Sequence, residues 1–333
     1  MFLILGLSIL LVTLLVLNNA ASLLTVLLWR MFGKRINRWS ARSAAQTLFL
    51  LRTLPSALSI GGVLFLFAPA YLRHESRVNH EDVSIKLGIL AVISMIGIAV
   101  ALARGIATWL ATRRLTAEWL NNSKPIHISS VTVPVYQVDH SFPLIAVVGA
   151  FRPRLFVATQ IFESLTPAEL TAALEHEKGH ILAHDNLKRA VVRACRDLSL
   201  ISVGSDMHDA WLEFSEAAAD EFAARQDRET GLDLASAIVK IARMIPAGAR
   251  PAITAGAFLA TEEGVRGFTA RVRRLVRVSE SDQHHFETTA SVISRLSLMI
   301  PAALTLLIGV VTFESRVLSA IHGVIEHAVY LLD

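Results

Sequence analysis

The residues best suited to chemistry in this 333-residue sequence are the histidines and the glutamate of His176-Glu177-Lys178-Gly179-His180. If the segment is helical, His176 and His180 are four residues apart on one face, where they can share a metal ion. Glu177 then lies beside them, within reach of a water molecule on that metal. HExxH on a helix is a known zinc-binding pattern in which the glutamate is the general base. The same pattern arises by chance in about a few per cent of chains of this length, so it is suggestive only.

A second pair of residues strengthens the zinc interpretation. Residues 211–225 are rich in alanine, lack glycine and proline, and are predicted to be helical, so Glu216 and Asp220 face the same way. Hydrolytic zinc sites use three protein ligands, and His, His and Glu form a known set. We therefore expect one Zn²⁺ per chain, bound by His176, His180 and Glu216. Asp220 is expected to accept the free N–H of a ligating histidine. The alternative is a solvated acidic face.

The metal-binding pattern lies in a segment with clear helix signals. Residues 166–185 read as one helix, with Thr166 as the N-cap, Pro167 at the first position and Glu169 completing a capping box. Gly179 costs about 1 kcal/mol relative to alanine in mid-helix, which a site needing close approach of another backbone would justify. Ahead of this helix, residues 131–138, 145–148 and 153–158 are predicted strands of a small sheet.

Two further histidines are candidates for stabilising the transition state. His184 and His208 lie near the metal-binding residues in the sequence, and either could donate to a developing oxyanion. A solvated surface position is the alternative for each. Cys195 is the only cysteine, which excludes an internal disulfide and fits a reducing compartment.

The composition predicts a membrane protein, with 53% hydrophobic and 18% charged residues. Long apolar runs account for the excess, since each approaches the roughly 20 residues needed to cross a bilayer. The predicted spans are residues 2–29, 53–72, 87–103 and a fourth within 291–313. The third is short and could instead be a buried core helix.

Lysine and arginine placement predicts the orientation of these spans. The loop 30–52 carries six basic residues and no acidic one, which predicts a cytoplasmic position, whereas loop 73–86 has no charge bias and is expected outside. Residues 1–114 would thus form an N-terminal membrane region and 115–290 a cytoplasmic metallopeptidase domain. Residues 314–333 would be a short extracytoplasmic tail. The net charge of +4 is explained by these flanks, and no nucleic-acid motif is present.

The motifs together resemble a known group of enzymes. HEKGH followed by ILAHD, with EAAAD on a second helix, resembles the gluzincin membrane metallopeptidases. Two families share this arrangement: the BlaR/MecR-type antirepressor peptidases, and the HtpX-type and CaaX-prenyl-type membrane proteases. Gly149 and Arg152-Pro153 before the metal-binding helix, and Arg271-Val-Arg-Arg-Leu275 after it, are similar to the first family, which we therefore place first. The resemblance covers Pro134 to Arg277.

We accordingly expect a mainly α-helical protein with multi-pass transmembrane helices and a cytoplasmic α+β, zincin-like (gluzincin) domain with a small β-sheet. Its expected activity is that of a zinc metalloendopeptidase of the inner or plasma membrane, with Glu177 as general base. The expected partners are the lipid bilayer and a cytoplasmic or membrane-proximal protein substrate. An antirepressor role makes a repressor protein a candidate partner. The alternatives are a quality-control protease and a membrane signalling scaffold that keeps zinc without cleaving.

Overall fold

The computed structural model describes residues 2–36, 39–75, 83–128, 131–199, 204–225, 227–245, 264–280 and 315–332, and it is mainly helical. The helices that precede the sheet are α1 (Phe2–Ile36), α2 (Ala41–Gly62), the π-helix η1 (Val63–Phe67), α3 (Ala68–His74) and α4 (Ile85–Asn121). The strands are β1 (Ser123–Ile126), β2 (Val135–Val138), β3 (Ile145–Val148) and β4 (Arg154–Ala158). The remaining helices are α5 (Thr159–Ser164), α6 (Pro167–Ala183), α7 (Asp185–Asp197), α8 (Ser205–Ala224), α9 (Arg228–Met244), α10 (Gly264–Glu280) and α12 (Ser315–Leu332).

Among the described residues, three helical segments are long and apolar enough to cross a membrane: Phe2–Ile36, Ala41–His74 and Ile85–Asn121. All three begin or end well beyond the apolar runs predicted from the sequence. In particular, α4 continues through residue 114, the expected end of the membrane region, and ends one residue before β1. The predicted fourth span, 291–313, lies outside the described residues.

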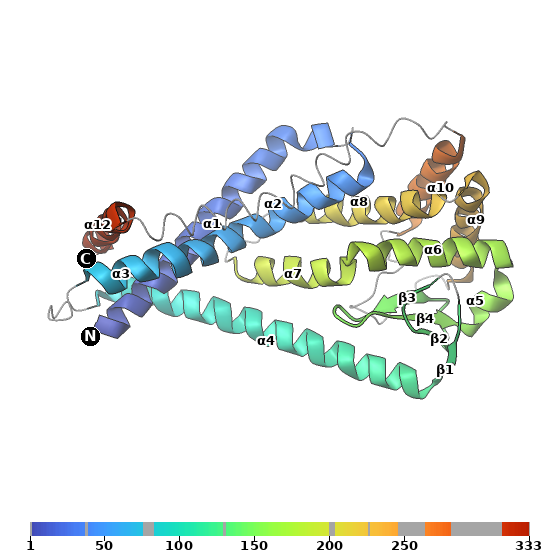
Figure 1. Cartoon of the computed structure of the whole chain (residues 1–333), viewed down its shortest axis with the longest axis horizontal. Helices are drawn as coiled ribbons and strands as arrows, with labels where there is room; N and C mark the ends of the chain where they lie inside the picture. The colour runs from blue at the N-terminus through green and yellow to red at the C-terminus, as the bar shows by residue number, and fades with distance from the viewer. Residues whose placement is uncertain are drawn as a thin grey trace.

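These helices give the molecule its elongated shape (Figure 1). α1, α2 and α4 run along the long axis, and the sheet lies at the far end of α4. α12 packs against α3 at the opposite end of the molecule, where His74 and His322 stack with ring centroids 5.7 Å apart. The connection between α1 and α2 lies instead at the end that holds α8 and α10.

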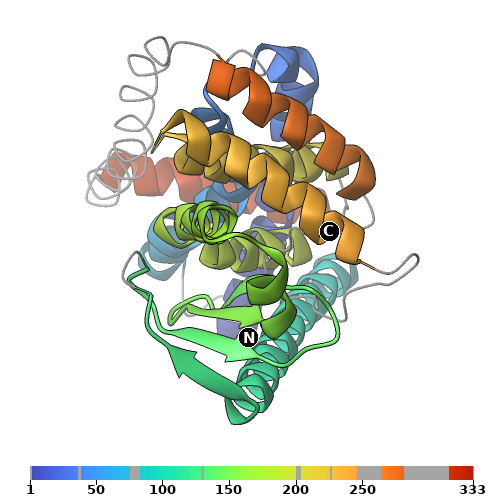
Figure 2. The ribbon, with the colours of Figure 1, turned by 90° about the vertical axis from the view of Figure 1, so that its right-hand side faces the viewer.

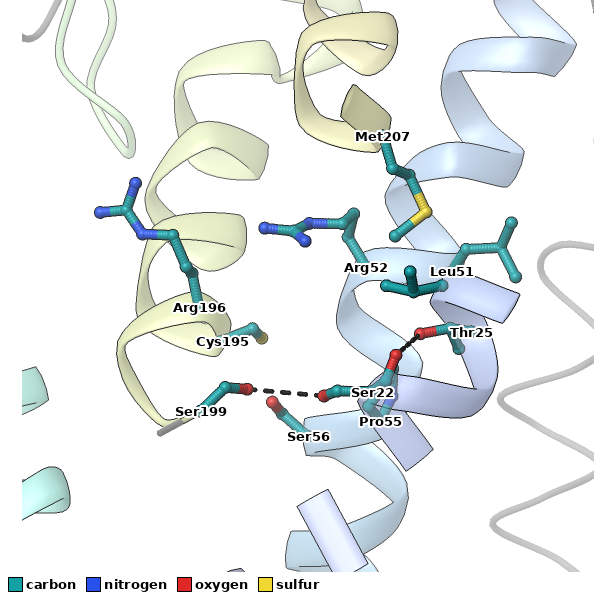
Figure 3. Close-up of a pocket in the computed structure, with 11 residues that line it drawn as sticks. Ser22, Thr25, Leu51, Arg52, Pro55, Ser56, Cys195, Arg196, Ser199 and Met207 are labelled. Atoms are coloured by element: carbon teal, nitrogen blue, oxygen red, sulfur yellow. Dashed lines mark hydrogen bonds between the residues drawn. The ribbon is translucent and has the colours of Figure 1, made fainter. Parts of the chain in front are cut away.

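A polar network joins the apolar helices to the rest of the chain. Asn18 is 2% exposed, and its Nδ2 donates to Leu198 O at 3.1 Å while Ser56 Oγ donates to its Oδ1 at 3.0 Å. Asn18 therefore faces α2 and the C-terminal end of α7. Beside it, a cavity of about 20 Å³ has room for about one water molecule. Cys195 and Arg52 line this cavity (Figure 3).

The sheet has four strands in the order β1-β2-β4-β3. β2 and β4 pair in parallel, and β1 and β3 lie at the edges in antiparallel pairs. The three predicted strand positions are confirmed, although the first begins at Val135 rather than at 131, and β1 was not predicted. β3 and β4 are almost entirely buried, so the sheet forms a hydrophobic support on one side of α6 (Figure 2).

Candidate metal centre

α6 presents the metal-binding pattern, and its ends explain how. Thr166 Oγ1 accepts from Glu169 N at 3.3 Å, and Glu169 Oε2 accepts from Thr166 N at 2.8 Å, which confirms the predicted capping box. The predicted single helix over 166–185 is wrong at its end. His184 has a left-handed backbone with φ 56° and ψ 38°, so α6 stops at Ala183 and a new helix, α7, starts at Asp185.

Close contact with α8 fixes the distance between the two helices that carry the candidate ligands. A Cβ on Gly179 would lie 3.2 Å from Ala219 Cα and 3.3 Å from a Phe222 ring carbon. The glycine therefore sits where another backbone approaches closely, which is the reason proposed for it from the sequence. The close approach brings Glu216 and Asp220 of α8 to the histidines of α6.

His176, His180 and Glu216 form a group that could hold a metal ion, with their ligand atoms all within 4.8 Å of one another. His176 Nε2 lies 3.6 Å from Glu216 Oε2, and His180 Nε2 lies 3.5 Å from Glu216 Oε1. Both histidines are buried, and His180 Nε2 has no hydrogen-bond partner within the described residues. A buried ring nitrogen without a hydrogen-bond partner, pointing toward a carboxylate, is suited to act as a metal ligand.

The free sides of both imidazole rings face carboxylates. His176 Nδ1 lies 3.0 Å from Asp220 Oδ1, and His180 Nδ1 lies 2.7 Å from Asp185 Oδ2. Burial alone would lower the pKa of His180, but Glu216 and Asp185 outweigh it and raise the pKa to about 10. The centre therefore stabilises positive charge between the rings, as a Zn²⁺ site must. No role was predicted for Asp185, although it is the last residue of the ILAHD segment that follows HEKGH.

Two arginines also reach Glu216. Arg271 of α10 contacts Glu216 Oε2 at 3.2 Å and Asp220 Oδ1 at 2.6 Å, and Arg189 of α7 contacts Glu216 Oε1 at 3.4 Å. Burial alone would raise the pKa of Asp220, but Arg271 and His176 outweigh it and lower the pKa to about 2. The ion pair of Arg271 with Asp220 joins α10 to α8, and only the tertiary fold could reveal it.

Glu177 occupies the inner side of the centre. It is 1% exposed, and its Oε2 has no hydrogen-bond partner among the described residues. Burial raises the pKa of the Glu177 carboxyl above its usual range, although His176 and His180 partly oppose the shift. A buried carboxyl with a raised pKa and a free oxygen is suited to taking up and releasing a proton.

The structure does not bring His184 or His208 into the ligand group. His184 is exposed at the junction of α6 and α7, and its Nδ1 lies 3.1 Å from Leu182 O. His208 is half-buried and stacks on Trp211, with ring centroids 5.8 Å apart. Burial and the nearby Arg52 lower the pKa of His208. The backbone N–H of His184 donates to His180 O at the end of α6, but within the described residues neither histidine side chain has a hydrogen bond or ion pair with His176, His180 or Glu216.

β3 is an edge strand, as a substrate-pairing strand must be, but one backbone group on its outer side already has a hydrogen-bond partner. All four of its residues are buried. Because Ala158 N donates to Leu144 O, the register directs the backbone groups of Ile145 and Val147 away from β4. Val147 O already accepts a hydrogen bond from Asn186 Nδ2 at 2.7 Å.

A helix that carries two buried histidines and a glutamate, with a third ligand from a second helix, defines a metallopeptidase centre of the HExxH class. The profile of Peptidase family M48 matches residues 113–288, which is more than half of the chain, and the chain belongs to this family. A comparison of the chain with individual curated proteins found no match.

The family match supports the M48 type of membrane protease, which was our second expectation, and gives no support to the antirepressor family, which was our first. HExxH and the Glu-Ala-Ala-Ala-Asp pattern are common to both, so these spacings could not separate them.

Proposed function

We propose that this protein is a membrane-embedded zinc endopeptidase that cuts a cytoplasmic or membrane-proximal protein. The observation that carries the proposal is the convergence of two buried histidines on Glu216, with the buried carboxyl of Glu177 beside them. Membership of a metallopeptidase family supports the same conclusion. The match offers no support for an antirepressor role or a repressor partner.

The chemistry divides between the metal and the side chains. His176, His180 and Glu216 would hold the ion, and bound zinc supplies Lewis-acid chemistry, lowering the pKa of water and polarising a carbonyl. Glu177 accepts a proton from the attacking water and delivers it to the leaving amine, which its raised pKa favours. Asp220 and Asp185 hold the two imidazole rings in one orientation. Arg271 keeps Asp220 ionised.

Activity and metal content provide the test. Glu177→Gln is expected to abolish cleavage of an unfolded reporter protein and to keep zinc, whereas Glu216→Ala is expected to lower the zinc content. Glu213→Gln, at an exposed position on the helix that carries Glu216, is the control for both variants. Turnover by Glu177→Gln would remove this residue from the mechanism. Zinc without turnover in the parent protein would favour the scaffold alternative.

The arrangement of the helices supports the proposed orientation. The basic connection between α1 and α2 lies at the end that holds α8 and α10, and α12 lies at the other end (Figure 1). The positive-inside rule then assigns the metal centre to the cytoplasm and α12 to the outside. With Cys195 replaced by alanine, a membrane-impermeant thiol reagent should label Ser319→Cys in intact cells and Ser205→Cys only after lysis. The reverse pattern would invert the topology.

A further inference from the structure

A large cavity lies between α4, α7 and the turn from β3 to β4. Its volume is about 830 Å³, which is in the range of sites that bury most of a drug-sized ligand. α4 and α7 are joined at one end of it, where Arg104 contacts Asp197 at 3.3 Å. Arg189 lines the cavity and also contacts Glu216, so the cavity adjoins the metal centre without including the candidate ligands.

The wall of this cavity is mostly apolar, and Trp109, Leu120 and Phe151 contribute to it beside small side chains of α4. Ala101, Gly105, Thr108 and Thr112 lie on one face of α4, at spacings of three and four residues. A Cβ on Gly105 would meet no atom within 4 Å. Phe151, at the turn, is 82% exposed. These features leave an apolar channel along α4 that suits acyl chains.

The polar part of the lining is strongly basic. It contains five arginines and one acidic residue, Asp197, whose carboxylate already contacts Arg104 and Arg196 at 3.3 Å each. Within the described parts of the chain, Arg152, Arg154 and Arg193 have no carboxylate partner in any recorded ion pair. The cavity therefore has a surplus of positive charge, which an anionic ligand would neutralise. The five arginines are Arg113, Arg152, Arg154, Arg189 and Arg193.

The length of α4 indicates where this charge lies. Its 37 residues extend about 55 Å, against about 30 Å for the hydrocarbon core of a bilayer. The apolar run predicted to cross ends at residue 103, and the cavity begins at Ala101. Arg113 lies ten residues, or about 15 Å, beyond that point, so the basic end of the cavity lies outside the hydrocarbon core.

We propose that this cavity binds one anionic phospholipid, with its phosphate among Arg152, Arg154 and Arg193 and its acyl chains along the small-residue face of α4. The ligand chemistry follows from the combination of an apolar channel that begins at the end of the predicted span and a basic end that lies beyond it. The inference rests on the membrane placement proposed above and is independent of peptidase activity.

Lipid retention measured by native mass spectrometry tests the proposal. The purified full chain in nonionic detergent is incubated with phosphatidylglycerol and phosphatidylcholine that carry identical acyl chains. Phosphatidylglycerol should be retained preferentially. Because each arginine near a lipid surface contributes roughly fivefold in affinity, Arg152→Gln with Arg193→Gln should weaken its binding about 25-fold. Gly105→Leu, which fills the channel, should reduce retention of both lipids.

Matched controls separate this site from general basic attraction and from the enzymatic proposal. Arg114→Gln with Arg228→Gln removes the same charge from exposed positions outside the cavity and should leave binding within about twofold. Glu177→Gln, which removes the proposed general base, should retain phosphatidylglycerol like the parent protein. A melting curve for each variant verifies that it is folded.

Three results would overturn the proposal. Equal retention of the two lipids, or retention unchanged by the cavity variants, would show that the cavity has another occupant. Displacement of phosphatidylglycerol by millimolar inorganic phosphate would indicate a site for a free anion. If the paired arginine change abolishes binding of an acidic reporter peptide and spares lipid retention, the cavity belongs to the substrate path.

Discussion

His180 Nδ1 lies 2.7 Å from Asp185 Oδ2, and this contact exists because α6 ends between the two residues. In an uninterrupted helix, residues five apart point about 140° away from one another. The left-handed backbone of His184 breaks the helix and turns Asp185 back toward the histidine. The orientation of a candidate metal ligand thus depends on a turn.

Asp185→Ala should lower the affinity for zinc by about 10–100-fold, the usual effect of removing a carboxylate behind a ligating histidine. Chelator competition measures the change, and Asp206→Ala, at an exposed position, is the control. His184→Asn retains a residue that tolerates the left-handed backbone and should leave both zinc affinity and turnover unchanged. Unchanged zinc affinity in Asp185→Ala would show that the contact is only structural.

The comparison of Asp185 with Glu216 shows what the sequence could predict about the centre. Helical spacing alone places His176 with His180 and Glu216 with Asp220, because four residues make nearly one turn. Arg271 and Asp185 reach the centre through a separate helix and a turn of unusual backbone, and no local periodicity encodes either. The sheet was predictable from its apolar runs, whereas β1 has exposed residues at its middle and carried no such signal.

Asp220 and Arg271 should be strongly coupled in their effects on the free energy of unfolding. Arg271→Met leaves a 1% exposed carboxylate without its cation, which should cost about 3–5 kcal/mol in the free energy of unfolding. Adding Asp220→Asn should recover part of that loss, because the buried charge is then removed as well. Denaturant unfolding of the four proteins in the double-mutant cycle measures the coupling. Additivity within about 0.5 kcal/mol would contradict a direct interaction.

Gly179→Ala tests the close approach of α6 and α8. Alanine favours the helix by about 1 kcal/mol, but its Cβ would lie 3.2 Å from Ala219 Cα, which belongs to the backbone of α8. We expect the helices to separate by a few tenths of an ångström and zinc affinity to fall several-fold. Ala219→Gly in the same protein should restore part of the affinity. A variant with unchanged zinc binding and higher stability would show that α8 can shift freely.

Glu169 should make stability depend on acid pH. Burial alone would raise its pKa, but Lys240, Ser236 and the Thr166 backbone outweigh it and lower the pKa from 4.5 to about 2. A carboxyl with a lowered folded-state pKa stabilises the fold above its unfolded pKa and loses that contribution as pH falls from about 4.5 to 2. Because the Lys240 side chain is 40% exposed, solvent screens the pair, and Lys240→Met should destabilise by about 1 kcal/mol near pH 7 and progressively less below pH 4.5.

Thermal unfolding of the parent protein and Lys240→Met between pH 3 and 7 measures how the difference in stability between them shrinks as the pH falls. Lys124→Met, at an exposed position on β1, is the control for the loss of one positive charge. A difference between parent and variant that is constant over the whole range would show that the lysine acts through packing alone.

A proline at Val147 tests whether the outer edge of β3 binds substrate. The backbone N–H of Val147 points away from β4, so Val147→Pro removes an outward donor and spares the ladder to β4. Zinc should remain bound while cleavage of an unfolded reporter falls. Ala146→Pro removes a donor that pairs with β4 and should destabilise the domain. Unchanged cleavage by Val147→Pro would exclude this edge as the substrate strand.

The continuity of α4 sets a minimum length for the substrate. The helix runs without a break from the apolar region to one residue before β1, so no hinge can lower the sheet toward the bilayer. If α4 crosses the bilayer as proposed, up to about 25 Å of it projects beyond the hydrocarbon core. An extended peptide covers about 3.4 Å per residue, so a membrane-anchored substrate needs about seven residues between its own span and the scissile bond. The protein would thus select its substrates by the reach of their tethers as well as by their sequence.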